Sequence, residues 1–179
     1  MPLSPTALIA SQITALLLLA ACGGLSEVTV HPIPGSGQSG VTATVVKVVD
    51  GDTVELRFPG REPEMVRLLG IDTPETVHPD RPVECFGPEA SAKASDLLPA
   101  GSQVLVQRDA EARDRYGRLL AYLWTFDGTF VNAELVAGGY AETLAIAPNN
   151  THRARLSALA AEAREMGAGL WSACPTDTG

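Results

Sequence analysis

The chain has 179 residues, of which 45% are hydrophobic, and a formal net charge of −8. This length favours one domain with a real core over two, and the hydrophobic content excludes disorder of the whole chain. The negative charge argues against a protein that simply coats nucleic acid, so any function directed at a polyanion must depend on local positive groups or a bound cation.

An apolar run followed by small residues opens the chain and ends at Cys22. The run is too short for a convincing membrane-spanning helix. The segment "LAAC", Leu19 to Cys22, resembles the lipobox of bacterial lipoproteins, in which cleavage precedes a cysteine that takes a lipid. We therefore predict a signal peptide over residues 1–22 and an exported protein, lipid-anchored through Cys22 to a membrane at the cell surface or in the periplasm. The alternative is an ordinary secretory signal, which would leave the protein secreted.

Residues 23–40 are rich in Gly, Ser and Pro, which predicts a flexible linker. His31 lies in this segment and is expected to be solvated. The folded domain is predicted over residues 41–174, and residues 175–179 are predicted to be a C-terminal tail.

Eight segments of the predicted domain carry strand or helix patterns. Runs rich in β-branched and apolar residues predict strands over residues 41–49, 53–58, 64–71, 102–108 and 118–124. Helical spacing between stop signals predicts helices over residues 87–98, 131–139 and 150–169. The pair Asp50-Gly51 predicts a hairpin, because glycine readily takes the positive φ of a tight turn. This order suits a small closed barrel with helices packed outside, with an open α+β sheet as the alternative.

Two cysteines, Cys85 and Cys174, lie inside the predicted domain and outside any CxxC arrangement. A metal site is therefore poorly supported. In an oxidising compartment a pair this far apart is expected to form a disulfide that joins the C-terminus to the middle of the domain. Two buried free thiols are the alternative.

Three short stretches place ionisable groups at strand ends: "DGDT" at 50–53, "RLLGIDTPE" at 67–75 and "DRYGR" at 114–118. Asp52 follows a turn and Asp72 ends a strand. Two carboxylates brought together repel each other unless a cation neutralises them, and a hard divalent cation does so with oxygen ligands. The alternative is that both are separate turn residues that bond to the nearby backbone.

Two arginines strengthen the case for one shared site. Arg67 lies within an apolar strand, where an unpaired guanidinium would be costly, and Arg118 precedes another apolar strand. A planar guanidinium can bind phosphate oxygens through two hydrogen bonds. The alternative is an internal ion pair with Glu75 or Asp72. Because Arg67 and Asp72 differ by an odd number of residues, a straight strand would point them to opposite faces, so we expect a bulge or turn near Gly70.

The motifs "VVDGDTVEL", "VRLLGIDTPE", "FGPEAS", "DRYGRLLAY", "PNNTH" and "GLWS", in this order, resemble the staphylococcal nuclease (thermonuclease) family. The resemblance runs from about Thr42 to Cys174. It implies a five-stranded OB-fold barrel with three α-helices over residues 41–174. It also implies Ca²⁺-dependent hydrolysis of DNA and RNA, with cleavage of the 5′ O–P bond and 3′-phosphate ends. We expect single-stranded or locally melted substrates and a monomeric protein.

The resemblance assigns roles to the acidic stretch. Asp52 and Asp72 would be carboxylate ligands of Ca²⁺, and Thr73 would add its carbonyl oxygen. Glu75 would be the general base for the attacking water.

The resemblance also assigns roles to basic and aromatic residues. Arg67 and Arg118 would hold the scissile phosphate, while Arg115 and Tyr116 match a Lys-Tyr pair that contacts the neighbouring phosphate. One departure is the segment before "PNN", which reads "LAIA", Leu144 to Ala147, where the best-known member bears tyrosine and lysine. Together with the acidic net charge, this departure predicts weaker substrate binding.

A competing interpretation is a non-catalytic OB-fold module, anchored to a membrane, that binds nucleic acid or protein. A lipid-anchored structural protein that uses the barrel as a scaffold is a third. The presence of Arg67, Glu75 and Arg118 together favours the enzyme, because binding alone does not require the glutamate.

Overall fold

The computed structural model describes residues 29–33, 39–77 and 82–174. The predicted signal peptide, its lipidated Cys22 and the predicted tail 175–179 lie outside the described residues. Within the described ranges, no helix combines the length and the apolar character needed to cross a membrane.

The elements alternate between short strands and short helices in an order close to the predicted one. The strands within the described ranges are β1 (Val30–Pro32), β2 (Ser39–Asp50), β3 (Thr53–Arg57), β4 (Glu64–Leu68), β5 (Gly70–Asp72), β6 (Gln103–Gln107), β7 (Leu119–Thr125) and β8 (Glu142–Leu144). The helices there are α1 (Gly87–Leu97), α2 (Val131–Ala137), α3 (Arg153–Glu165) and α4 (Leu170–Ala173). The short elements β1, β8 and α4 were not predicted.

Five strands close into a barrel. The main sheet has the order β1-β2-β3-β4-β7-β6, and a further pairing of β2 with β6 completes the ring. The strand β2 can serve both neighbours because its first part pairs with β6 and its second part with β3, with register shifts that bend it between Val45 and Asp50. The strands β4 and β7 run parallel, and the other pairs are antiparallel. The predicted OB-fold barrel is confirmed, and the open sheet is excluded.

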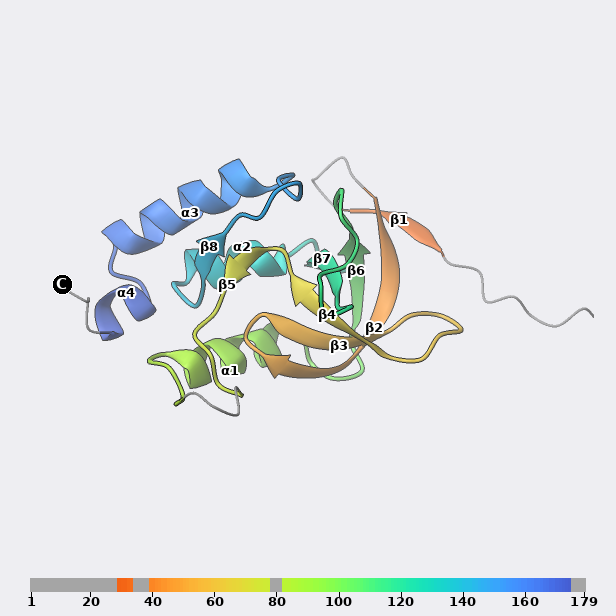
Figure 1. The fold of residues 1–179 in the computed structure, drawn as a ribbon, viewed down its shortest axis with the longest axis horizontal. Coiled ribbons are helices and arrows are strands. Elements are labelled where there is room, and N and C mark those ends of the chain that lie inside the picture. The colour runs from red at the N-terminus through yellow and green to blue at the C-terminus, as the bar shows by residue number, and fades with distance from the viewer. Residues whose placement is uncertain (1–28, 34–38, 78–81, 175–179) are drawn as a thin grey trace, which may run out of the picture.

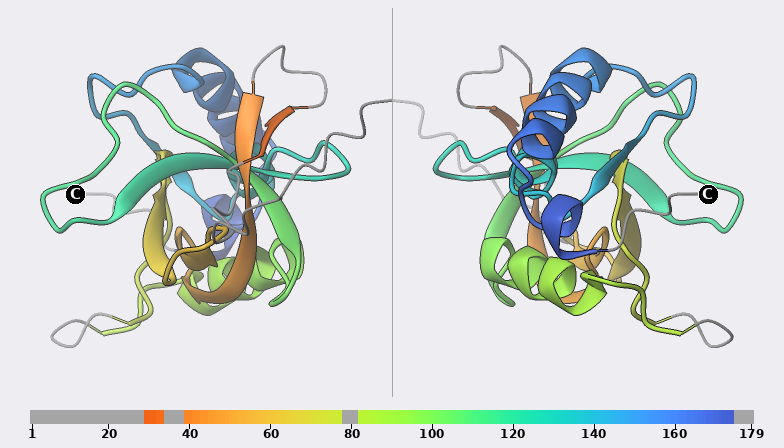
Figure 2. Two further views of the ribbon diagram at one scale, coloured as in Figure 1. Left: turned by 90° about the vertical axis from the view of Figure 1, so that its right-hand side faces the viewer. Right: turned by 90° about the vertical axis from the view of Figure 1, so that its left-hand side faces the viewer.

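The helices cover the outside of the barrel. In Figures 1 and 2, α1 and α3 lie on opposite sides of the barrel, and α2 lies between α3 and the strands. The alternating inward residues of the strands form one apolar core with the buried faces of these helices. The second, two-stranded sheet pairs β5 with β8 beside α3 and brings residues 70–72 next to residues 142–144.

Part of the predicted linker is a strand. Residues Val30–Pro32 pair with β2 in antiparallel register, and the ring of His31 lies 6.0 Å from that of Phe126. Ile33 is 2% exposed and belongs to the core. The folded unit therefore begins before residue 41. Pro32 is tolerated because β1 is an edge strand, and Ile33 adds buried apolar surface to the core.

The hairpin between β2 and β3 forms where it was predicted, for a different reason. Asp50 pairs with Thr53, and Asp50 Oδ1 accepts a hydrogen bond from the backbone N–H of Gly51 at 2.8 Å. The φ of Gly51 is not positive. A Cβ at this position would lie 2.7 Å from Thr73 Oγ1, so close approach of the two segments requires glycine here.

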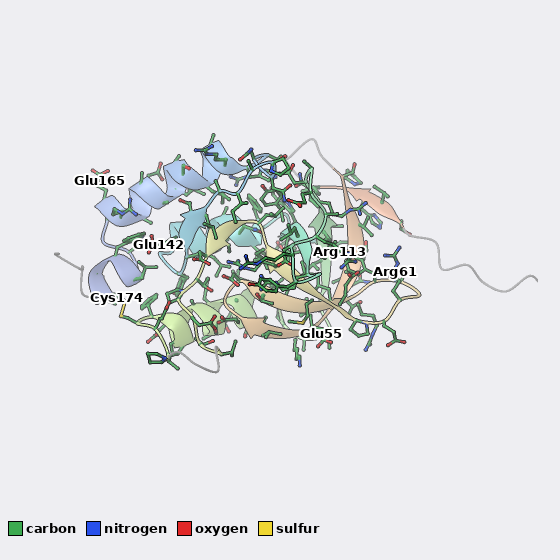
Figure 3. All side chains as sticks on the ribbon, in the orientation of Figure 1. Glu55, Arg61, Arg113, Glu142, Glu165 and Cys174 are labelled. Carbon is green, nitrogen blue, oxygen red and sulfur yellow. A yellow bond between two sulfur atoms is a disulfide. The ribbon has the colours of Figure 1, made fainter. Side chains whose placement is uncertain are left out.

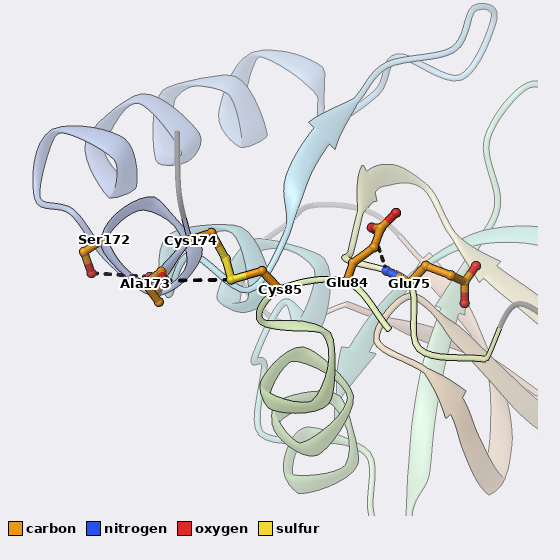
Figure 4. The surroundings of a disulfide bond; sticks show 7 residues. Glu75, Glu84, Cys85, Ser172, Ala173 and Cys174 are labelled. Carbon is orange, nitrogen blue, oxygen red and sulfur yellow. Dashed lines mark hydrogen bonds between the residues drawn. A yellow bond between two sulfur atoms is a disulfide. The ribbon is translucent and has the colours of Figure 1, made fainter. Parts of the chain in front are cut away.

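The predicted disulfide is present and joins Cys85 to Cys174 across 89 residues. Figure 4 shows the bond between the segment before α1 and the end of α4. The alternative of two free thiols is therefore wrong.

A histidine is enclosed by aromatic rings at the start of α3. The ring of His152 lies 4.5 Å from that of Tyr122 and 4.8 Å from that of Phe130. Its Nε2 lies 3.1 Å from Oε1 of Gln107, which also accepts a hydrogen bond from the indole of Trp124 at 3.3 Å. Burial lowers the pKa of His152, as does the charge of Arg155, while Asp109 acts in the opposite sense.

We expect the free energy of unfolding to fall between about pH 7.5 and about pH 5.5 because of His152. Below its ordinary pKa of 6.5, the unfolded chain binds a proton that the folded protein does not, and stability decreases as the pH falls. Urea unfolding at both pH values would measure this for the wild type and for His152→Gln. The variant should lose less stability over the interval. Equal losses in the two proteins would contradict this assignment.

Candidate active site

The turn between β2 and β3 places Asp52 at the bottom of a pocket. Asp52 is 6% exposed. Its Oδ1 accepts a hydrogen bond from Thr53 Oγ1 at 3.0 Å, and its Oδ2 accepts one from the backbone N–H of Thr73 at 3.1 Å. The turn is thus tied directly to the segment that follows β5.

The predicted break after Arg67 lies between β4 and β5. Gly70 has a φ of +77°, which a residue with a side chain rarely adopts, and it turns the chain so that Asp72 returns toward Arg67. The buried side chain of Asn132 in α2 fixes this break, because its Nδ2 donates to the carbonyl of Leu69 at 2.9 Å. The odd separation of Arg67 and Asp72 in the sequence therefore predicted the position of this break correctly.

Arg67 joins both predicted metal ligands. Its Nη1 lies 2.8 Å from Asp52 Oδ2, and its Nη2 lies 2.7 Å from Asp72 Oδ1. Nη1 also donates to the carbonyls of Leu68 and Ile71, at 3.2 Å and 3.0 Å. The side chain is 14% exposed, so this guanidinium holds the acidic residues in place as well as lying at the pocket.

Burial raises the pKa of Asp52, although the charge of Arg67 and the hydrogen bonds from Thr73 and Thr53 act to lower it. The neighbouring carboxylate of Asp72 raises it further. The charge of Arg67 therefore does not fully offset the burial of Asp52, and a further positive charge beside this carboxylate would favour its ionised form.

The donor set suits a hard cation such as Ca²⁺. The carboxylates of Asp52 and Asp72 share one guanidinium, and the buried hydroxyl of Thr73 has no hydrogen-bond partner within the described part of the chain. No group of three His, Cys, Asp or Glu side chains forms a metal centre among the described residues. Backbone carbonyls and water would therefore complete the ligand shell, as is common for Ca²⁺.

Glu75 lies on a loop that its own side chain stabilises. Its Oε1 accepts hydrogen bonds from the backbone N–H groups of Thr76 and Val77, at 3.0 Å and 2.8 Å. The hydroxyl of Thr76 donates to Asp50 Oδ1 at 2.6 Å, and Ser91 of α1 donates to the same oxygen at 3.0 Å. Asp50 thus fastens the Glu75 loop to the β2–β3 hairpin and to α1.

Arg118 is held by a neighbour that the sequence analysis did not assign. Its Nε donates to Asp114 Oδ2 at 2.7 Å, and its backbone N–H donates to Asp114 Oδ1 at 2.9 Å. The alternative weighed for both arginines, an internal ion pair with Glu75 or Asp72, holds for Arg67, which pairs with Asp72, and does not hold for Arg118. Local i, i+4 proximity within "DRYGR" was the signal that pointed to Asp114.

Arg115 and Tyr116 lie on the turn before Arg118. Arg115 Nη2 donates to the hydroxyl of Tyr116 at 2.6 Å, and the Arg118 guanidinium lies 5.6 Å from the ring centre of Tyr116. Tyr116 is 68% exposed. Arg113 supports this turn, because its Nη1 donates to the carbonyl of Gly117 at 2.7 Å, and Figure 3 shows it over the barrel strands.

One pocket of about 550 Å³ gathers these groups. The three predicted acids, both predicted phosphate-binding arginines and two of their neighbours line it: Asp52, Asp72, Glu75, Arg67, Arg118, Thr73 and Tyr116. Arg115 lies outside this lining and borders a second pocket. The structure brings the scattered charged residues together, while Glu75 forms no ion pair with either arginine.

The second pocket, of about 500 Å³, adjoins the first and shares Arg67, Tyr116 and Arg118 with it. Leu144 and Ile146 line it in the segment "LAIA". These side chains are exposed, at 40% and 62%. Apolar side chains therefore line this pocket in the segment where the family resemblance indicated that tyrosine and lysine are missing.

Residues that sequence reasoning missed mostly support others. Asp50 was expected only to shape a turn, Asp114 was not given a partner, and Asn132 was not singled out. Buried polar residues such as Asn132 carry no sequence signal, because their partners are backbone groups brought close only by the fold.

Comparisons with known proteins place the chain in a family. The family described as staphylococcal nuclease homologue matches residues 65–173. The thermonuclease of Staphylococcus intermedius is 37% identical over 132 residues, which cover 74% of this chain and 77% of that protein. The thermonuclease of Staphylococcus hyicus is 35% identical over 131 residues, 73% and 76% of the two chains. Endonuclease YhcR of Bacillus subtilis is 36% identical over 149 residues, 79% of this chain and 12% of that protein. The predicted resemblance is thus confirmed, and the chain belongs to the staphylococcal nuclease family.

Proposed function

We propose that the protein is a Ca²⁺-dependent nuclease that hydrolyses phosphodiester bonds of DNA and RNA. Relatives named thermonuclease and endonuclease support a nuclease. The observation that carries the proposal is the single pocket lined both by the carboxylates of Asp52, Asp72 and Glu75 and by the guanidinium groups of Arg67 and Arg118. Cleavage of the 5′ O–P bond, with 3′-phosphate products, is the part of the proposal that rests on the family resemblance alone.

Binding of the scissile phosphate would fall to the two arginines. Arg118 is the better placed, because its Nε bonds to Asp114 while its Nη groups make no hydrogen bond to a described residue. They can therefore stabilise the charge that gathers on the phosphoryl oxygens in the transition state. Arg67 would also bind the phosphate, while its ion pairs orient Asp52 and Asp72.

Glu75 would accept the proton of the attacking water. Its Oε1 accepts hydrogen bonds from two backbone N–H groups, whereas its Oε2 makes no hydrogen bond within the described residues, and the residue lines the pocket. Asp52, Asp72 and the carbonyl of Thr73 would hold Ca²⁺, which supplies polarisation of a phosphoryl oxygen when bound. A general base in this position contributes typically ~10²–10⁴-fold.

The substrate strand would continue past Arg115 and Tyr116. The exposed Tyr116 ring offers a face on which an unpaired base can stack, which supports a preference for single-stranded or locally melted nucleic acid. We also propose that the protein acts as a monomer, since every residue assigned a role at the scissile phosphate comes from the same chain and the site requires none from a second copy.

The proposal predicts cleavage of single-stranded DNA by the purified protein in Ca²⁺ and none in excess chelator. The physical reason is that Arg67 does not fully offset the burial of Asp52, so that a bound cation would favour the ionised carboxylate on which the proposed site depends. Gel analysis of end-labelled DNA measures both cleavage and the phosphate position. Binding without cleavage in Ca²⁺ would favour the non-catalytic module, and equal cleavage in chelator would exclude Ca²⁺ dependence.

We also propose that the protein is exported and anchored through Cys22. The proposal rests on the segment Leu19 to Cys22, which lies outside the described residues. Mass spectrometry of the native N-terminus tests it: a mature chain that begins elsewhere than at a diacylated Cys22 would contradict the lipid anchor.

A further inference from the structure

The backbone of Glu75 is bonded on both sides to one residue, Glu84. The N–H of Glu75 donates to Glu84 Oε2 at 3.0 Å, and the N–H of Glu84 donates to the carbonyl of Glu75 at 2.9 Å. Figure 4 shows the two glutamates side by side, with the side chain of Glu84 directed at the Glu75 backbone. The two bonds close a small ring that restrains the backbone of Glu75 itself, in addition to the contact of Asp50 with the next residue, Thr76.

Glu84 is itself poorly held by noncovalent contacts. Residues 82–85 are all exposed, and an exposed hydrogen bond contributes little net free energy because water competes for both groups. The carbonyl of Glu84 accepts a hydrogen bond from the N–H of Gly87 at 3.1 Å, at the start of α1. Apolar packing begins only at Phe86, whose ring lies 5.5 Å from that of Tyr140.

The disulfide supplies the missing restraint. Cys85 follows Glu84 directly and is bonded to Cys174, with 5.8 Å between their Cα atoms. Cys174 directly follows α4, and its backbone N–H donates to the carbonyl of Leu170. Leu170 is buried and its own N–H donates to the carbonyl of Gly139, so α4 is fixed to the body of the protein. A covalent and well-anchored link therefore ends one residue away from Glu84.

We propose that Glu84, restrained by the Cys85–Cys174 disulfide, is a positioning residue for Glu75. This inference rests on the proposed function of Glu75 as the general base. Breaking the disulfide releases the segment that carries Glu84, and the Glu75 carboxylate then samples positions away from the attacking water. A displacement of about 1 Å at a reacting group can reduce the rate about a hundredfold. The reaction rate therefore depends on the thiol–disulfide state of two cysteines that touch neither substrate nor metal.

Glu84→Ala tests the contact, and Glu84→Gln tests its chemistry. With single-stranded DNA and saturating Ca²⁺, Glu84→Ala should lower kcat about tenfold and leave KM within about twofold, because the loss concerns the base and not substrate binding. Glu84→Gln should recover most of the rate, since its amide oxygen can accept the same hydrogen bond from Glu75. Glu165→Ala is the matched control, because the side chain of this exposed acid at the end of α3 makes no hydrogen bond or ion pair with another described residue, and the change should leave kcat unchanged.

The role of the disulfide is tested with the variant Cys85→Ser/Cys174→Ser and with the reduced wild type. Both should show the same fall in kcat as Glu84→Ala, and a phosphine reductant should not slow the serine variant further. Far-UV circular dichroism at the assay temperature shows that each protein is folded. A kcat for Glu84→Ala within twofold of the wild type, or a reduced wild type as active as the oxidised one, would overturn the proposal.

Amide hydrogen exchange tests the contact without turnover. Protection of the Glu75 N–H should decrease in Glu84→Ala and in the serine variant and should persist in Glu84→Gln. Unchanged protection would overturn the positioning role even in an active enzyme. An inactive wild type whose Glu75 N–H is protected as described would instead refute the proposed nuclease function, so the two failures are distinguishable.

Discussion

Arg118→Ala is expected to lower kcat by about 10²–10³-fold while the fold remains intact. The lost interaction is the one that would form with the phosphoryl oxygens as charge accumulates in the transition state, and single donors at such positions have effects of about this size. The fold should tolerate the change, because the ion pair of Arg118 with Asp114 is local, between residues four positions apart, and neither side chain belongs to the apolar core. Asp114 also keeps its hydrogen bonds from the backbone of Tyr116 and of residue 118.

Single-turnover cleavage of a short single-stranded DNA at saturating Ca²⁺ measures this effect, with urea unfolding as the check on stability. Arg153→Ala is the matched control, since Arg153 is exposed at the start of α3 and makes no side-chain hydrogen bond or ion pair with another described residue. Arg67 is a poorer test, because its removal leaves Asp52 buried without its partner and should destabilise the protein by about 3–5 kcal/mol. A rate for Arg118→Ala within fivefold of the wild type would exclude its role at the phosphate.

Glu75→Gln is expected to reduce kcat by about 10²–10⁴-fold, the range for a general base. The amide retains an oxygen that can accept the hydrogen bonds from Thr76 and Val77, so the loop should keep its shape. The amide of the variant, however, cannot accept a proton at any working pH. The change therefore separates proton acceptance from positioning, which a change to alanine would not.

Single-turnover cleavage of the same DNA at saturating Ca²⁺ is the informative measurement for this variant. Glu75→Gln should cleave more slowly than the wild type by the factor given above, while its KM stays close to that of the wild type. Glu142→Gln serves as the control, because Glu142 is an exposed acid whose backbone pairs with Asp72. If Glu75→Gln kept the cleavage rate of the wild type, another group would be the base.

The sequence predicted the barrel strands and the three longer helices because their apolar residues follow clear periods. It did not predict β5 and β8 as a pair, because three-residue strands are too short to show a period, and all of β8 is exposed. The linker prediction failed at β1 for a related reason: composition dominated by Gly, Ser and Pro concealed the burial of Ile33. Short elements are stabilised by partners distant in sequence, and those partners are visible only in the fold.

The members of the site were predicted better than their pairings. Asp52, Asp72 and Arg67 meet as expected, because one break near Gly70 is enough to bring them together. The spacing of four residues between Asp114 and Arg118 in "DRYGR" was a usable signal that went unused. The bonds of Glu75 to Glu84 could not be derived from patterns, since they depend on the path of loops rather than on strand alternation. The chemical roles themselves came from the family resemblance and not from periodicity.

The closed barrel also affects how the protein behaves in concentrated solution. Each of its five strands has a neighbour on both sides, so within the described ranges free strand edges remain only on the three-residue β1 and on the short β5–β8 ribbon. Pro32 at the end of β1 has no N–H to donate to an added strand. Few sites are left where another chain could extend the sheet, and the excess of acidic residues adds mutual repulsion. The architecture thus opposes edge-to-edge aggregation.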